Sequence, residues 1–247
     1  MIQSKEEYIE NTFSKVNISI TKRQACQFLK YYELLTEWND KINLTAITEF
    51  EDVCNKHFAD SSLFFRLFDS FDESVISLSG KKLVDVGTGA GFPGIVLKIL
   101  YPDLSIVLLD SLDKRIRFLN EVISTLELSD IVAVHGRVED LARMSEYREV
   151  FDFSTARAVA ALPVLSEYCL PFVKMGGSFI AYKSEKTDEE VSSSKKAFDI
   201  LGGKLERLVS FELPDSASFR TLVEVKKVKS TPSSYPRKAG TPVKKPL

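Results

Sequence analysis

The spacing of apolar residues divides the chain into two parts. Up to about residue 75 they recur at three- and four-residue intervals, as on one face of a helix. One predicted helix follows the capping box Thr21-x-x-Gln24. Its apolar stripe consists of Ala25, Phe28, Leu29, Tyr32 and Leu35. The pattern predicts a helical N-terminal extension over residues 1–75, acting as a cap, and a separate domain over residues 76–229.

Within this extension, polar turn-forming residues mark the predicted helix ends. Asn and Asp side chains between Trp38 and Thr45 favour a turn, so the helix is expected to break there. Two shorter helices are predicted over Val53–Phe58 and Ser61–Phe71.

The second part alternates short apolar runs with helical stretches. Seven runs have the length of strands: Lys82–Val86, Ser105–Leu109, Ile131–His135, Phe151–Ser154, Gly177–Lys183, Leu205–Leu213 and Thr221–Val228. Helical stretches follow each of the first five, which predicts an α/β fold with a doubly wound, mostly parallel sheet. A short loop without a helix joins the last two, so the last strand is predicted to run antiparallel. This arrangement is that of a Rossmann-like, class I methyltransferase fold.

A glycine-rich turn ends the first predicted strand. It reads Asp85-x-Gly87-x-Gly89-x-Gly91 and continues through Phe92 into a helix. Glycines permit positive φ and let a ligand approach the main chain closely. The pattern resembles the first motif of S-adenosylmethionine (AdoMet) methyltransferases.

The same turn also allows a dinucleotide interpretation. Gly89, Gly91 and Gly94 match G-x-G-x-x-G, which keeps an NAD(P)-dependent oxidoreductase as an alternative. In that fingerprint the first glycine follows the strand directly, whereas here Gly87 holds that place. A glycine turn without a ligand is the third possibility.

The other strand ends supply candidate site residues, because ligands of open parallel sheets lie at the carboxyl ends of the strands. Asp110 lies 23 residues after Gly87, close to the spacing of about 20 at which a carboxylate binds ribose hydroxyls. Val138 and Glu139 follow the third strand and are predicted to frame an adenine, the alternative being a simple helix start.

Further candidates follow the fourth and fifth strands. Arg157 is predicted to face cofactor and acceptor, and Lys183 is a candidate phosphate contact. His57, in the helical extension, is either a substrate contact or a hydrogen-bonded structural residue.

Composition narrows the class of protein. Hydrophobic residues make up 44% and charged residues 28%, which are ordinary globular values. No apolar run has the length of a membrane span, and the first ten residues lack a signal-peptide pattern. Three scattered cysteines predict a reducing, cytoplasmic location, and no Cys/His spacing predicts a metal site.

The C-terminal end is strongly basic. Residues 225–247 contain seven Lys or Arg and no acid, and residues 230–247 contain four prolines. An extended tail over residues 230–247 that binds a polyanion is therefore predicted, with a merely solvated basic end as the alternative.

Two motifs that are missing from the sequence narrow the kind of base atom that could accept a methyl group. The Pro-Pro loop common in enzymes that methylate exocyclic base amines is missing after the fourth strand. Cys169, which lies in a predicted helix, does not suit the thiolate that ring carbon 5 methylation needs. Guanine N7 fits, because it bears no proton and needs only alignment with the sulfonium methyl.

Five segments together resemble the glucose-inhibited-division protein B family, also called RsmG, over nearly the whole chain. They are Leu35–Ile47 with its Trp38-Asn39-x-Lys41-Ile42-Asn43-Leu44-Thr45 run, Lys56-His57-Phe58-x-Asp60-Ser61, Asp85–Gly94, Thr155-Ala156-Arg157-Ala158 and Tyr235-Pro236-Arg237-Lys238-x-Gly240-Thr241-Pro242. The resemblance implies an AdoMet-dependent enzyme that methylates N7 of a guanine in the 530 loop of 16S rRNA, in the small ribosomal subunit, releasing S-adenosylhomocysteine.

The resemblance also implies residue roles. Cofactor positions fall on Gly87, Phe92, Val138, Glu139 and Arg157, while Gly89 and Gly91 shape the loop and Asp110 matches an acid that binds ribose. Arg157 and His57 are the predicted catalytic residues. The predicted RNA contacts are Lys183, Arg237, Lys238, Lys244 and Lys245. A monomer is expected, and a non-catalytic RNA-binding ribosome-assembly factor remains the alternative from another class.

Overall fold

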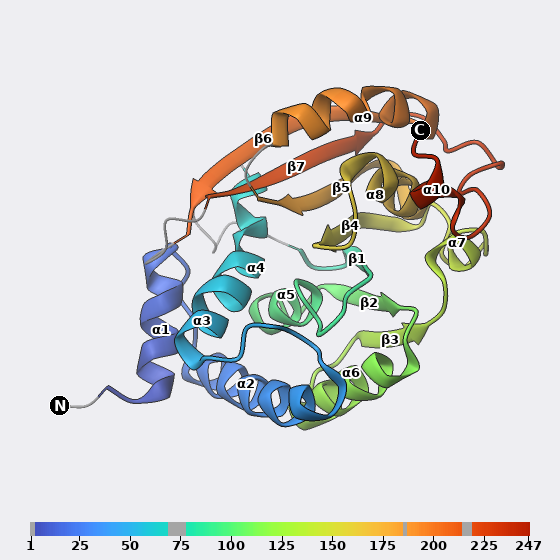
Figure 1. Ribbon diagram of the computed structural model, residues 1–247. Helices are drawn as coiled ribbons and strands as arrows, with labels where there is room; N and C mark the ends of the chain where they lie inside the picture. Colours follow the sequence, from blue (N-terminus) through green and yellow to red (C-terminus); the bar gives the residue numbers. More distant parts are fainter. Residues whose placement is uncertain (1–2, 69–77, 185–186, 214–218) are drawn as a thin grey trace.

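The computed structural model describes residues 3–68, 78–184, 187–213 and 219–247. Its centre is one seven-stranded sheet in the order β3-β2-β1-β4-β5-β7-β6 (Figure 1). The strands are β1 Lys82–Val86, β2 Ser105–Asp110, β3 Ile131–His135, β4 Phe151–Arg157, β5 Val173–Lys183, β6 Gly203–Glu212 and β7 Phe219–Lys227. Strands β1 to β5 pair in parallel, and β7 runs antiparallel to both β5 and β6. The predicted Rossmann-like methyltransferase topology is confirmed.

The strand order reverses between β1 and β4, which are neighbours in the sheet but far apart in the chain. Such a switch point opens a crevice at the carboxyl ends of the strands. β4 is longer than predicted: it continues beyond Ser154 to Arg157, because Arg157 still pairs with Tyr182 of β5. The fourth strand therefore carries Arg157 to the edge of that crevice.

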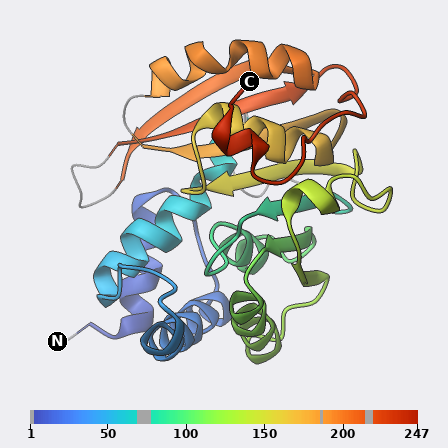
Figure 2. The ribbon, with the colours of Figure 1, turned by 45° about the vertical axis from the view of Figure 1, so that its right-hand side comes forward.

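Helices cover both faces of the sheet (Figures 1 and 2). On one face lie α5 Gly94–Leu100 and α6 Asp113–Thr125, whose buried residues share a core with the N-terminal helices. On the other lie α8 Leu162–Cys169 and α9 Thr187–Leu201, which form a second core with β4, β5 and β7. The short helix α7, Val138–Leu141, follows β3.

The N-terminal part is helical, as predicted. It contains α1 Lys5–Lys15, α2 Lys22–Ile42, α3 Phe50–Val53 and α4 Asp60–Ser62, with a π-helical turn over Cys54–Ala59 and a 3₁₀ turn over Leu63–Leu67. The predicted end at Phe71 and the boundary between residues 75 and 76 fall within residues 69–77, outside the described part of the chain.

The predicted helix break at Trp38 is wrong. Helix α2 continues to Ile42 and ends at Asn43, which has a φ of 52°. Trp38 stays helical because its ring packs on Phe118 of α6, with ring centroids 5.8 Å apart. The turn forms after the end of α2 instead, where the Asn39 side-chain oxygen accepts hydrogen bonds from the backbone N–H groups of residues 44 and 45.

Polar side chains of α2 also bind the glycine loop after β1 and helix α5 beneath the cap. The Tyr31 hydroxyl donates to the Ala90 carbonyl, and Gln24 donates to the Ile99 carbonyl over 2.8 Å. The cap thus satisfies backbone carbonyls of the glycine loop and of α5.

The prediction of an extended tail is wrong as well. After β7 the chain folds back against α7 and α8 and ends in the short helix α10, Thr241–Lys244 (Figure 2). Arg148 donates to the carbonyls of Thr231 and Tyr235, at 2.8 and 2.9 Å. Backbone carbonyls bonded in this way lie against the protein rather than in solvent.

Candidate functional site

The glycine loop between β1 and α5 has the backbone conformation that its sequence predicts. Gly87, Gly89 and Gly91 have φ values of 68°, 61° and 94°. A Cβ at Gly87 would lie 2.9 Å from a methyl carbon of Val159. The absence of a side chain at this position therefore keeps two loops, those after β1 and β4, in contact.

Asp85 stabilises this loop through hydrogen bonds from its buried side. Its buried carboxylate accepts hydrogen bonds from the Thr88 hydroxyl (2.6 Å), the Gly94 N–H (3.0 Å) and the Thr155 hydroxyl (3.0 Å). Burial raises the pKa of Asp85 to about 6, although these hydrogen bonds oppose the shift. The acid that precedes the first glycine is thus a structural support of the loop.

The start of α5 does not suit a pyrophosphate. Pro93 has no N–H, the Gly94 N–H donates to Asp85, and the Ile95 N–H donates to the Gly91 carbonyl over 2.8 Å. A dinucleotide site needs such groups free to bind phosphate. This arrangement argues against the oxidoreductase alternative.

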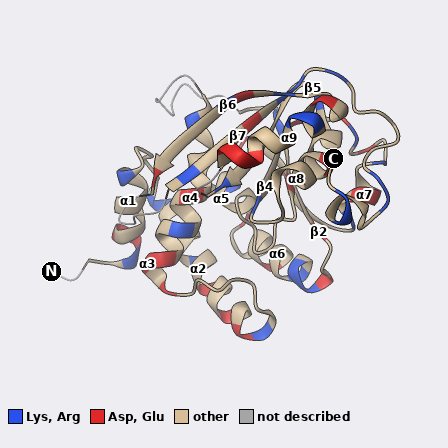
Figure 3. Ribbon diagram, turned by 45° about the horizontal axis from the view of Figure 1, so that its top comes forward, with Lys and Arg blue, Asp and Glu red and all other residues tan. Residues whose placement is uncertain are grey.

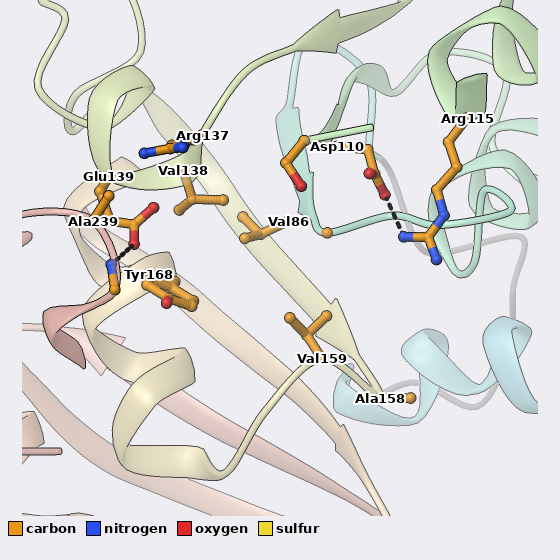
Figure 4. A pocket seen from close by; sticks show the side chains of 13 residues that line it. Val86, Asp110, Arg115, Arg137, Val138, Glu139, Ala158, Val159, Tyr168 and Ala239 are labelled. Atoms are coloured by element: carbon orange, nitrogen blue, oxygen red, sulfur yellow. Dashed lines mark hydrogen bonds and ion pairs between the residues drawn. The ribbon is translucent and has the colours of Figure 1, made fainter. Parts of the chain in front are cut away.

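A cavity of about 610 Å³ opens at the carboxyl ends of β1, β2 and β3 (Figure 4). Its volume falls within the ~300–1,000 Å³ of typical small-molecule sites. It is lined by Val86, Gly87, Asp110, Ser111, Arg115, Arg137, Val138, Glu139, Ala158, Val159, Tyr168, Ala239 and Gly240. The wall contains both apolar and hydrogen-bonding groups, which suits a nucleoside.

The structure brings four predicted cofactor residues together in this cavity: Gly87, Asp110, Val138 and Glu139. Asp110 is nearly buried, and its carboxylate accepts from the N–H groups of Gly89 (3.0 Å) and Leu112 (2.9 Å) and from Arg115 (3.2 Å). These bonds fix the carboxylate at the cavity wall, where its contact with ribose stays a prediction.

Gly89, Gly91 and Phe92 lie in the loop behind the cavity and are not among its lining residues. The glycines shape the turn, as expected. Phe92 is buried under the cap, with its ring 5.4 Å from that of Tyr31. Its role is therefore expected to be packing of the loop rather than direct lining.

Arg157 and His57 lie beside each other at the boundary between cap and sheet. The Arg157 guanidinium donates to His57 Nδ1 (3.0 Å), to the Asp60 carboxylate (3.0 Å) and to the Lys56 carbonyl (3.2 Å). It also lies over the Phe92 ring, 4.9 Å from the centroid. The cluster fixes the end of β4 against the cap.

His57 is held in its neutral form. Its other ring nitrogen, Nε2, lies 2.8 Å from the Thr45 hydroxyl, and its ring stacks on Phe92 at 4.4 Å. Burial, and then the neighbouring Arg157 charge, lower the pKa of His57 to about 3. With both nitrogens bonded, this side chain is poorly placed to take a proton from substrate.

A second cavity of about 250 Å³ adjoins the first. It is lined by Asp60, Arg157, Ala158, Tyr182, Lys183, Ser184, Thr187, Glu190 and Arg220. Ala158, which has a φ of 57°, lines both cavities. A compound in the second cavity would thus face a compound in the first across the loop that follows β4.

The predicted RNA contacts divide into two groups. Lys183 pairs with Glu190 at 2.7 Å, and Arg237 pairs with Glu167 at 2.6 Å, so both charges already have internal partners. Lys238, Lys244 and Lys245 are exposed. Both basic and acidic residues occur in α6 (Figure 3). RNA contact by all five residues stays a prediction.

Sequence reasoning missed Tyr168, Ala239 and Gly240 as cavity residues. Tyr168 lies in a helix, and burial, together with Glu139, raises the pKa of its hydroxyl to about 12. Ala239 and Gly240 come from the tail, where basic charge alone drew attention. The match of Tyr235–Pro242 to the family motif was the available signal.

Residues 24–219 match the family model "rRNA small subunit methyltransferase G", named GidB. The chain belongs to this family. It is 54% identical over 232 residues to the ribosomal RNA small subunit methyltransferase G of Lachnoclostridium phytofermentans, covering 94% of this chain and 93% of that protein. It is 50% identical to the enzyme of the same name from Acetivibrio thermocellus, covering 95% and 93%. The predicted family is thereby confirmed, and with it an AdoMet-dependent rRNA methyltransferase.

Solved structures agree on the fold. The chain is similar to a 16S rRNA (adenine-N1)-methyltransferase from Catenulisporales acidiphilia, with a TM-score of 0.51, 16% identity and coverage of 62% and 87%. It is also similar to TYW2 of M. jannaschii, solved in complex with AdoMet, with a TM-score of 0.50, 16% identity and coverage of 62% and 72%.

None of the helices among the described residues is both long and apolar enough for a bilayer crossing.

Proposed function

We propose that this protein transfers the methyl group of AdoMet to N7 of a guanine in the 530 loop of 16S rRNA. The observation that carries the proposal is the cavity at the end of β1, which Gly87 of the glycine loop lines, in a chain of the small-subunit methyltransferase G family. Its walls fit AdoMet: a glycine without a side chain at Gly87, an ordered carboxylate at Asp110 and an apolar surface at Val138. AdoMet supplies the electrophilic methyl group.

The chain's own residues position the reactants. Gly87 and Val159 hold the two loops together at the donor, and Asp110 and Glu139 present carboxylates to the nucleoside. The second cavity, next to Ala158, receives the target base after it leaves the stack. Arg157 forms part of its wall and orients the base.

No proton has to be removed in this reaction, because guanine N7 attacks through an unprotonated lone pair. A neutral His57 that is bonded on both nitrogens suits such a mechanism: it positions Arg157 rather than acting as a base. Rate enhancement then comes from alignment of N7 with the sulfonium methyl. The enzyme acts in the cytoplasm as a monomer, and the exposed tail lysines contribute to RNA affinity.

Transfer of a tritiated methyl group tests the proposal. Assembled 30S particles and naked 16S rRNA, each lacking the modification, are incubated with AdoMet and protein, and the labelled nucleotide is mapped. Incorporation at one guanine of the 530 loop is expected, with Gly87→Arg as the inactive control. RNA binding without incorporation would instead support an assembly factor, and a change of nicotinamide absorbance would support an oxidoreductase.

A further inference from the structure

The tail segment Thr231–Gly240 reaches the wall of the AdoMet cavity. From its contacts we infer that this segment is part of the cofactor site and that Glu167 is the positioning residue that anchors it. The inference rests on the proposed function, since it names a part of the same donor site. The ligand it helps to bind is the nucleoside half of a sulfonium or thioether nucleoside.

The end of the segment forms part of the cavity itself. Ala239 and Gly240 line the side on which Val138 and Glu139 lie (Figure 4). The Gly240 N–H donates to Glu139 Oε1 over 3.2 Å. Glu139 is therefore oriented by the tail, and the tail by Glu139. Removal of the segment would open one side of the cavity to water.

An anchor lies three residues earlier. Arg237 donates to Glu167 through its backbone N–H (2.7 Å), through Nε (2.9 Å to Oε1) and through a terminal guanidinium nitrogen (2.6 Å to Oε2). The Glu167 side chain is only 1% exposed. Such a bidentate, charge-assisted pair fixes both partners in one orientation. Glu167 directly precedes Tyr168, which lines the cavity, so the anchor and the wall share one helix.

Two arginines between α7 and β4 hold the start of the segment. Arg148 donates to the carbonyls of Thr231 and Tyr235, and Arg143 donates to those of Ser234 (3.2 Å) and Pro236. With further bonds from Arg143 to the Ser233 carbonyl and from Arg148 to the Pro232 carbonyl, each guanidinium joins three carbonyls of the segment. Hydrogen bonds from charged donors to backbone fix the path of the chain rather than any one side chain.

All of these contacts join groups of the chain itself, so the protein's own side chains hold this wall in place. A ligand entering the cavity then does not have to order ten residues of chain, and pre-organisation of this kind raises affinity. The segment was predicted to bind RNA because it is basic; its three internal anchors give it a second role at the donor. Loss of an anchor should weaken donor binding even in the absence of RNA.

The test is calorimetric titration of full-length protein with S-adenosylhomocysteine, without RNA. Glu167→Gln removes the charge and retains the shape of the side chain. Gly240→Ala keeps all three anchors and strains the cavity rim, because Gly240 has a φ of 79° while nothing lies within 4 Å of an added Cβ. A tenfold or larger rise in Kd is expected for Glu167→Gln and a smaller rise for Gly240→Ala.

The matched control is the double variant Lys244→Ala, Lys245→Ala, in exposed positions of the same tail. Its Kd should stay within twofold of the unmodified protein. Amide hydrogen exchange supplies the second readout: residues 231–240 should exchange faster in Glu167→Gln while the strands of the sheet do not. If Glu167→Gln does not fold, the result for Gly240→Ala decides.

Two results overturn the inference. One is faster exchange of residues 231–240 with an unchanged Kd, because the tail is then free and the site is intact. The other is a control variant that weakens binding as much as Glu167→Gln. Failure of the proposed function looks different: the unmodified protein itself would bind no S-adenosylhomocysteine.

Discussion

The buried His57 makes the stability of this protein dependent on pH in a definite direction. Protonation would place a cation 3.0 Å from a guanidinium nitrogen of Arg157, in a site that is nearly closed to water. Burial and this charge lower the pKa of His57 from 6.5 to about 3. As the pH falls below about 6.5, His57 therefore takes up a proton in the unfolded chain and stays neutral in the folded chain.

Linkage turns this difference into free energy. Because the pKa of His57 is lower in the folded state, its contribution to the free energy of unfolding is complete above pH 6.5. This contribution is lost as the pH falls toward 3. Between pH 8 and pH 5 the loss amounts to about 2 kcal/mol, from about 1.4 kcal/mol per pH unit below 6.5. Asp85 acts in the opposite sense, because its raised pKa favours the folded state as pH falls from about 6.

Comparison with His57→Gln isolates the His57 contribution. Urea unfolding of both proteins at pH 8 and pH 5 gives four free energies of unfolding, and the stability advantage of the unmodified protein should shrink by about 2 kcal/mol at the lower pH. His135→Gln, at an exposed position, is the control. An advantage that is equal at both pH values would refute the reasoning, since His57 would then titrate alike in both states.

Three further predictions concern the two cavities and the tail. Gly87→Ala should lower stability by about 1–2 kcal/mol through its positive φ and also weaken AdoMet binding in a calorimetric titration; Gly89→Ala, with nothing nearer than 4.0 Å, should show the strain with a smaller binding loss. Equal binding losses would contradict the steric explanation. Asp60→Asn removes a buried charge that pairs with two arginines, so thermal unfolding should show a loss of about 3 kcal/mol; an unchanged Tm would contradict this. Lys244→Ala with Lys245→Ala should flatten the salt dependence of 16S rRNA binding by ~0.7–0.9 in log–log slope for each phosphate that the variant no longer neutralises; an unchanged slope would remove these lysines from the interface.

Local patterns were sufficient to predict the sheet. The first strand is a short apolar run that stops at an acid and a glycine, and the glycines then appear with positive φ as the pattern requires. The reversal of the last strand followed from the short connection before it. The alternation of strands and helices follows from residues that are close together in the sequence, so it can be predicted without knowledge of tertiary contacts.

Tertiary contacts account for the errors. Trp38 continues its helix because Phe118 of α6 covers its ring, a partner 80 positions away. The tail folds back because Arg237 finds a buried carboxylate at Glu167, 70 residues earlier. A basic, proline-rich segment looks the same whether its partner is RNA or its own domain.

Within the site, prediction succeeded for residues at strand ends and failed for residues from elsewhere. Asp110 and Val138 reach the cavity because parallel strands place their carboxyl ends side by side. Tyr168, on a helix, and Gly240, in the tail, reach it only through tertiary packing. His57 was assigned either a substrate or a structural role, and its hydrogen bonds favour the structural one.

The interior of the N-terminal helices is continuous with that of the sheet. Phe28 and Tyr31 of α2 belong to the same buried cluster as Ile95 of α5 and Leu119 of α6. A chain without the N-terminal helices would expose this apolar face of the sheet to solvent and would tend to aggregate. The two regions should accordingly melt together, as a single calorimetric peak, despite their different sequence periodicities.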